Sequence, residues 1–148
     1  MTRPRSTALA AAGQAWCAIL VAAGLCWPAM APAADPAPIP LTATIRNDPA
    51  GEPLRCVMVM AHFVTVDLEA IAPGEEISIA LARDAGTRTL IVTAADGRQM
   101  VLETVLCGAT SAWAETRSAV PLMPLRETAD RRILYTCRIG RRLSCEAK

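Results

Sequence analysis

The stretch that decides the fold is RCVMVMAHFVTVDLE, residues 55–69. Its valines and its phenylalanine favour β-strands. In an extended strand every second side chain points to the same face, so the pattern predicts that Cys56, Met58, Met60 and His62 share one face. The run is longer than the usual strand of about five or six residues. We therefore expect either one long bent strand or two strands in succession.

Short apolar runs separated by turn residues continue on both sides of this stretch. EISIALA, residues 76–82, alternates cleanly and would bury Ile77, Ile79 and Leu81 on one face. Asp96 and Gly97 form a strong hairpin signal between two further runs. Beyond residues 55–69, strands are expected at 41–47, 76–82, 88–94 and 98–107, and a hairpin turning near Gly140 is expected at 131–147.

After Gly108 the pattern changes. TSAWAETRS, residues 110–118, predicts one short helix near 110–117, capped by Thr110 or Ser111. The following VPLMPL contains two prolines and cannot be a central strand. The fold class predicted from these patterns is all-β: a small disulfide-stapled β-sandwich, either an immunoglobulin-like or a cupredoxin-like Greek key. The immunoglobulin tryptophan between bridged cysteines is missing, because Trp113 follows Cys107.

The beginning of the chain predicts a secretory signal peptide at residues 1–33. Arg3 and Arg5 precede 29 uncharged residues at 6–34, with a small-residue A-x-A site ending at Ala33. The alternative is an uncleaved signal anchor, because a stretch of this length can span a bilayer. Cleavage would leave a proline-rich lead-in at 34–40 and a single domain at 41–148. We expect a bacterial periplasmic or secreted protein with no transmembrane span after cleavage.

Cleavage would leave four cysteines. An even number in an oxidising compartment predicts two structural disulfides, and no C-x-x-C redox motif is present. Four cysteines allow three pairings, but a three-residue hairpin loop at 140–142 would place Cys137 directly opposite Cys145. The expected partner of Cys56 is then Cys107.

Composition excludes several classes of function. The mature chain would carry 13 basic and 14 acidic residues, which is not the balance of a nucleic-acid-binding protein. Phe63, Trp113 and Tyr135 would be its only aromatic residues, too few for a stacking platform. No serine lies in a G-x-S-x-G nucleophile elbow and no catalytic constellation is apparent. We therefore expect a protein that is not an enzyme.

Charge is distributed unevenly along the domain. Residues 126–148 carry seven basic and three acidic residues, whereas residues 34–125 carry six basic and eleven acidic ones. This polarity favours docking to an acidic partner or to anionic headgroups. The other interpretation is that the basic hairpin folds back onto the acidic sheet. Tryptophan and arginine recur at binding hot spots, so the residues expected to contact a partner are Arg138, Arg141, Arg142, Trp113 and Arg117.

A second class of function is copper handling, because thioether and imidazole ligands suit Cu(I). The candidate ligands are Met58, Met60 and His62. On a regular strand, neighbouring side chains of one face lie about 7 Å apart, so one ion would require a bend near Ala61 with His62 at the surface. The alternative is that the methionines fill the core.

The sequence thus predicts an exported, non-enzymatic accessory domain without a cofactor. Its partner would be another periplasmic or membrane-associated protein. The alternative is a periplasmic copper-handling protein.

Overall fold

A computed structural model describes residues 36–94 and 96–148. The predicted signal peptide at 1–33 lies outside these residues, as do Cys17 and Cys26. The strands of the described part are β1 (Ile39–Asn47), β2 (Leu54–Met60), β3 (Val64–Asp67), β4 (Glu76–Arg83), β5 (Leu90–Thr93), β6 (Gln99–Ala109), β7 (Ser118–Ala119), β8 (Arg132–Ile139) and β9 (Leu143–Ala147). The helices are a 3-10 turn, η1 (Ala61–Phe63), and two α-helices, α1 (Trp113–Thr116) and α2 (Met123–Glu127).

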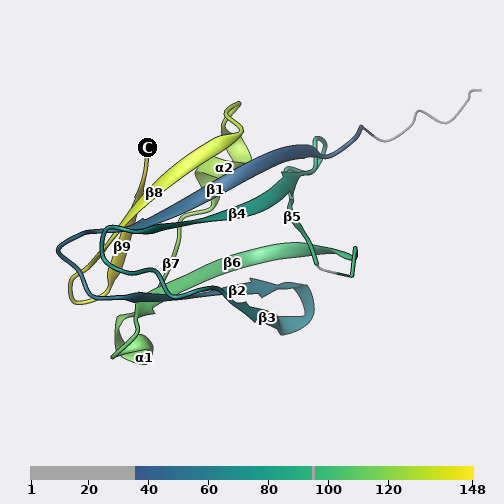
Figure 1. The fold of residues 1–148 in the computed structure, drawn as a ribbon. Coiled ribbons are helices and arrows are strands. Elements are labelled where there is room, and N and C mark those ends of the chain that lie inside the picture. The colour runs from purple at the N-terminus through teal and green to yellow at the C-terminus, as the bar shows by residue number, and fades with distance from the viewer. Residues whose placement is uncertain (1–35, 95) are drawn as a thin grey trace, which may run out of the picture. The chain divides into compact units, whose positions relative to one another are not determined.

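The strands form one hydrogen-bonded sheet that folds over into two layers. Its order is β3-β2-β6-β5-β4-β1-β8-β9, and the short β7 pairs with β6. Figure 1 shows β8, β1 and β4 in one layer and β6, β2 and β3 in the other, with β5 passing between them. The predicted all-β, disulfide-stapled sandwich is confirmed. The choice between immunoglobulin-like and cupredoxin-like topology stays a prediction.

The core lies between the two layers and follows the alternation of the strands. In β4, Ile79 and Leu81 are buried and Ile77 is half-buried, as predicted. In β2, Cys56, Met58 and Met60 point inward, which confirms that the methionines fill the core. The alternation in β4 continues into Arg83, whose side chain enters the interior and is only 8% exposed.

His62 does not share the buried face of β2, so that part of the prediction is wrong. The stretch 55–69 forms two strands in succession, and β2 pairs antiparallel with β3 through Met60 and Val64. The chain must therefore reverse within Ala61–Phe63. A reversal this short requires positive φ angles, and His62 and Phe63 adopt them at 63° and 59°. As a result His62 is exposed.

Each disulfide joins directly opposed residues of neighbouring antiparallel strands. Cys56 faces Cys107 across β2 and β6, and Cys137 faces Cys145 across β8 and β9. The carbonyl of Cys56 points away from β6, toward the β3 side, where it accepts a hydrogen bond from the N–H of Leu68, the residue after β3. Cys56 and Cys107 are therefore a non-hydrogen-bonded pair, the kind in which the two Cα atoms approach most closely. Both Cα–Cα distances are 4.1 Å, and both predicted pairings are confirmed.

The short helix predicted near 110–117 is present as α1, but its predicted caps are wrong. Ala112 precedes the helix and provides no side-chain cap. The Thr110 hydroxyl donates instead to the carbonyl of Pro53, and the Ser111 hydroxyl donates to Glu52. Both side chains hold a neighbouring loop, so the helix begins later than the capping rule predicts.

Two further features differ from the sequence-based expectations. β1 begins at Ile39, so two residues of the predicted lead-in belong to the sheet and pair with β4.

Helix α2 was not predicted. It starts within VPLMPL and has Pro124 in its first turn, where a missing N–H costs nothing. The guanidinium of Arg83 donates to the carbonyls of Leu125 and Thr128, at 2.9 and 2.6 Å, and satisfies the end of this helix.

Tyr135 carries a testable consequence of burial. Its ring is fully buried, and its hydroxyl has no hydrogen-bond partner within the described residues. Because a buried hydroxyl without a partner is costly, we expect Tyr135→Phe to raise the free energy of unfolding by about 1 kcal/mol. Burial also raises the pKa of Tyr135 from 10.0 to about 12.

The same side chain predicts a pH dependence with a definite sign. A pKa raised in the folded state means that the stability is fully present below pH 10 and is lost as the pH rises toward 12. Urea unfolding between pH 8 and 12 measures this loss. The wild type should weaken more steeply than Tyr135→Phe above pH 10, and parallel curves would contradict the assignment.

Candidate functional site

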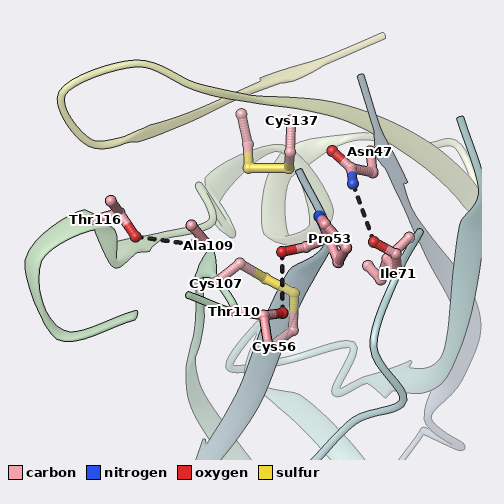
Figure 2. Close-up of a disulfide and its surroundings, with 10 residues drawn as sticks. Asn47, Pro53, Cys56, Ile71, Cys107, Ala109, Thr110, Thr116 and Cys137 are labelled. Atoms are coloured by element: carbon pink, nitrogen blue, oxygen red, sulfur yellow. Dashed lines mark hydrogen bonds between the residues drawn. A yellow bond between two sulfur atoms is a disulfide. The ribbon is translucent and has the colours of Figure 1, made fainter. Parts of the chain in front are cut away.

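The loop at residues 48–53 organises one end of the sandwich. Asn47 is fully buried, and its side-chain amide donates to the carbonyls of Glu52 and Ile71 at 2.9 and 3.0 Å. Asp48 accepts a hydrogen bond from Ala50 N–H in the manner of an Asx turn. These bonds fix the loop from inside, and Figure 2 shows the side-chain amide of Asn47 directed at the carbonyl of Ile71.

The segment at residues 110–117 is held against the same loop. The backbone N–H and the hydroxyl of Thr110 both donate to the carbonyl of Pro53, at 2.9 and 3.0 Å. The hydroxyl of Thr116 accepts from Ala109 N–H and donates to the carbonyl of Ala112. Gly108 allows the close approach, because a Cβ at this position would lie 2.9 Å from Arg117 Cα. The segment is therefore anchored at several points (Figure 2).

The hairpin at residues 137–145 contacts the other side of the loop. Asp48 N–H donates to the carbonyl of Cys137 at 2.9 Å, and Arg138 donates to the Asp48 carboxylate at 2.8 Å. Hydrogen bonding from Ala50 N–H, and secondly from Arg138, lowers the pKa of Asp48 from its ordinary value. We call the loop 48–53, the segment 110–117 and the hairpin 137–145 together the hairpin end. Figure 1 shows the hairpin tip, this loop and α1 at the same end of the domain.

The hairpin end contains all five residues that the sequence predicted for partner binding. Arg141 and Arg142 lie exposed in the hairpin loop. Arg138 is also exposed and lies in β8, where it pairs with Ser144 of β9. Trp113 is half-buried, with the guanidinium carbons of Arg55 and Arg117 at 5.1 and 4.8 Å from its ring centre. These distances are those of cation–π contacts.

The ion pairs show which cations are already neutralised. Four salt bridges occur within residues 36–94 and 96–148: Arg46–Glu76, Arg55–Asp67, Arg98–Asp96 and Arg138–Asp48. Arg138 therefore does fold back onto the acidic part of the domain, as the second interpretation of the charge pattern expected. Arg141 and Arg142 belong to none of these four pairs, and for these two residues docking to an acidic partner stays a prediction.

A shallow polar hollow of about 150 Å³ lies on β8 and β9 beside the hairpin tip. Residues with side chains on one face of these strands line it, namely Thr136, Arg138, Ser144, Glu146 and Lys148. Two cations and two hydroxyls can bind a carboxylate oxygen, and Glu146 can accept from a donor beside it. The hollow suits one polar side chain better than an apolar ligand.

The structure contains the bend that the copper hypothesis requires, but Met58, Met60 and His62 do not lie together. The chain bends at Ala61–Phe63 and His62 is exposed. Met58 and Met60 are 7% and 2% exposed, so their sulfur atoms belong to the core. No group of three or more His, Cys, Asp or Glu side chains suited to a metal occurs within the described part of the chain. Copper binding stays a hypothesis that would require both methionines to leave the interior.

The residues that support the hairpin end through contacts with distant parts of the chain were not predicted from the sequence. Asn47, Asp48 and Pro49 are a recognisable turn signal, but nothing local indicates that Asp48 binds Arg138, which lies 90 residues further on. In the sequence, Gly108 marks only the point where the strand pattern stops. Its role depends on the return of Arg117 to the same place.

Comparisons with known proteins give no match, so the site is interpreted from its geometry alone. No protein-family model, no curated protein and no solved structure matches the chain. Among residues 36–94 and 96–148, no helix is both long enough and apolar enough to cross a bilayer. The two disulfides are compatible with an extracellular or periplasmic location.

Proposed function

We propose that this chain is an exported, non-enzymatic binding domain whose hairpin end docks to an acidic surface of another periplasmic or membrane-associated protein. The export signal proposed at 1–33 and the two disulfides both fit an oxidising compartment. The observation that carries the docking proposal is the pair Arg141 and Arg142, exposed at the tip of a hairpin and outside all four salt bridges of the described residues.

Rigidity of the hairpin supports this function. The Cys137–Cys145 bridge closes the hairpin three residues from Gly140, and the bond between Asp48 N–H and the carbonyl of Cys137 ties its base to the loop. A surface that is ordered before binding loses less conformational entropy when a partner docks. The two arginines are thus presented on a fixed scaffold rather than on a flexible tail.

The chemistry of the hairpin end favours an acidic protein surface. Arginine binds carboxylates bidentately, and the hollow beside the tip offers Lys148 and the hydroxyls of Thr136 and Ser144 to a further acidic side chain. Trp113, between Arg55 and Arg117, adds an apolar contact at the same end. Uncovered charges at an interface act chiefly on the rate and specificity of association, so we expect binding to weaken as salt is added.

A charge-reversal experiment tests this proposal. The Arg141→Glu/Arg142→Glu protein and the wild type are each cross-linked in cells of the native host, and the partners are identified and quantified by mass spectrometry. Replacing two attractive contacts with two repulsive ones should weaken the complex by about tenfold to a hundredfold. The matched control is Arg131→Glu/Arg132→Glu, which makes the same change in net charge at the opposite end of β8.

The control separates docking at the hairpin end from a general effect of charge. We expect the control to recover partners within about twofold of the wild type, because its charges lie far along the strand and rim charges away from a contact contribute little. Equal losses in both variants, or recovery of monomer alone from the wild type, would refute the proposal.

A further inference from the structure

The edge strand β3 is a second surface, separate from the hairpin end, and it presents backbone hydrogen-bonding groups that point away from the sheet. Within residues 36–94 and 96–148, β3 ends the strand order of the sheet and pairs only with β2. Leu68 N–H donates to the carbonyl of Cys56, and hydrogen-bonded pairs alternate along an antiparallel ladder. Val64 and Val66 therefore bond to β2, while the backbone N–H and C=O groups of Thr65 and Asp67 point away from the sheet.

This edge carries only part of the protection that usually guards an open strand: β3 is short, at four residues, but its exposed side chains are largely apolar. Phe63 is 88% exposed, and Val64 and Val66 are 42% and 39% exposed. Lysine and proline discourage added strands, and residues 63–67 contain neither. The one charge of β3, on Asp67, is paired with Arg55 of the neighbouring strand. At the other end of the sheet, β9 is flanked by Arg142 and Lys148 and carries Glu146. The two edges are thus built differently.

The turn that presents Phe63 is strained. His62 and Phe63 are consecutive non-glycine residues with positive φ angles of 63° and 59°. Such conformations are costly for residues with a Cβ and often lie at binding sites. In the isolated domain the turn leaves the largest apolar side chain of this edge in water, so the strain brings no packing within the described residues.

We propose that β3 binds an extended segment of a partner protein as an added antiparallel strand. The segment would pair with the free groups of Thr65 and Asp67 and place apolar side chains at alternate positions against Phe63, Val64 and Val66. The acidic residues at the end of β3 determine which charge the bound segment should carry there. Asp67 is bound by Arg55, and Glu69 belongs to none of the salt bridges of the described residues. The segment therefore carries lysine or arginine at that end.

A peptide library provides the probe. Nonapeptides with valine, isoleucine or leucine fixed at alternate positions, and all residues allowed between them, are displayed and selected on the wild-type protein. We expect enrichment of peptides with lysine or arginine at one end. Backbone amide exchange by NMR should show Thr65 and Asp67 becoming protected when the selected peptide binds, because their N–H groups are free only in its absence.

Two substitutions test the geometry. Thr65→Pro removes an outward N–H without touching the β2 ladder, and proline is tolerated at such edge positions. We expect it to weaken peptide binding about tenfold. Phe63→Gly should weaken binding similarly and should not lower the melting temperature, since glycine accepts a positive φ without strain. Met123→Ala, at an exposed apolar residue in α2, is the matched control and should bind as the wild type does.

A second measurement keeps the test decisive if Thr65→Pro fails to fold. The selected peptide is methylated at the backbone nitrogens that face β3, and it should then lose binding to the wild-type protein. No enrichment from the library, or equal binding by the methylated peptide, would overturn the proposal. Dimerisation that depends on Phe63 in the absence of peptide would overturn it too, by assigning the edge to a second copy. Arg141→Glu/Arg142→Glu should leave peptide affinity unchanged, so this proposal and the hairpin-end proposal fail separately.

Discussion

The Cys56→Ala/Cys107→Ala protein should lose about 4 kcal/mol of its free energy of unfolding, because the bridge closes a loop across 51 residues. Closing a long loop restricts the unfolded chain more than closing a short one. The Cys137–Cys145 bridge spans 8 residues, and its removal should cost only about 2.5 kcal/mol. Small domains are stable by about 5–15 kcal/mol, so the first change removes a large share of the total.

Urea unfolding followed by Trp113 fluorescence and by circular dichroism measures both losses. The comparison of the two double variants is the control, because each removes one bridge from a pair of adjacent strands. We expect the Cys56 variant to unfold at the lower urea concentration. The opposite order would show that the long bridge does not restrain the unfolded chain as the topology implies.

The second large effect concerns Gly108, which lies buried in β6 beneath the segment 110–117. A Cβ at this position would lie 2.9 Å from both Arg117 Cα and Arg117 N, and 3.1 Å from the Thr116 hydroxyl. Backbone atoms cannot rotate away as the end of a side chain can. We therefore expect Gly108→Ala to cost about 3 kcal/mol, the upper end of the range for overpacking, and to push the segment that carries Trp113 outward.

Gly140→Ala is the matched control for this substitution. A Cβ at Gly140 would come no closer than 3.8 Å to the Arg142 carbonyl, which is an ordinary contact. We expect Gly140→Ala to remain within about 0.5 kcal/mol of the wild type. Thermal unfolding gives the stability, and a red shift of Trp113 emission reports displacement of the segment. Wild-type stability and emission in Gly108→Ala would contradict the tight packing described for this position.

The strands and the Cys137–Cys145 pairing were predictable because they depend on patterns that are local in sequence, and the pairing of Cys56 with Cys107 then followed by elimination. Alternation in EISIALA reports which face is buried, and the loop at 140–142 sets the register that opposes Cys137 and Cys145. His62 escaped prediction because the turn of Ala61–Phe63 contains no glycine, asparagine or aspartate to signal positive φ angles. The alternation of residues 56–62 therefore indicates a strand through His62, whereas β2 ends at Met60.

The arrangement of the hairpin end was only partly predictable, for a different reason. The arginines of the hairpin were evident from charge and spacing. Asp48, which binds Arg138, and Gly108, which admits Arg117, act through contacts between distant parts of the chain. Helix α2 was missed likewise, because its last carbonyls are satisfied by Arg83 of β4, which lies 42 residues before Leu125. A sequence pattern carries no sign of such partners.

Docking through the hairpin end is tested most directly by site-specific photo-cross-linking in cells of the native host. A photoreactive amino acid replaces Arg142 at the exposed hairpin loop in one strain, and Arg131, the exposed residue just before β8, in another. Both proteins are irradiated under the same conditions, and each cross-linked species is identified by mass spectrometry.

The hairpin-end proposal predicts a cross-linked partner protein with an acidic surface from position 142 and none from position 131. It also predicts that adding Arg141→Glu to the first strain reduces the product by about tenfold. Partner cross-links from position 131 alone, or only uncross-linked monomer from position 142, would contradict docking through the hairpin end.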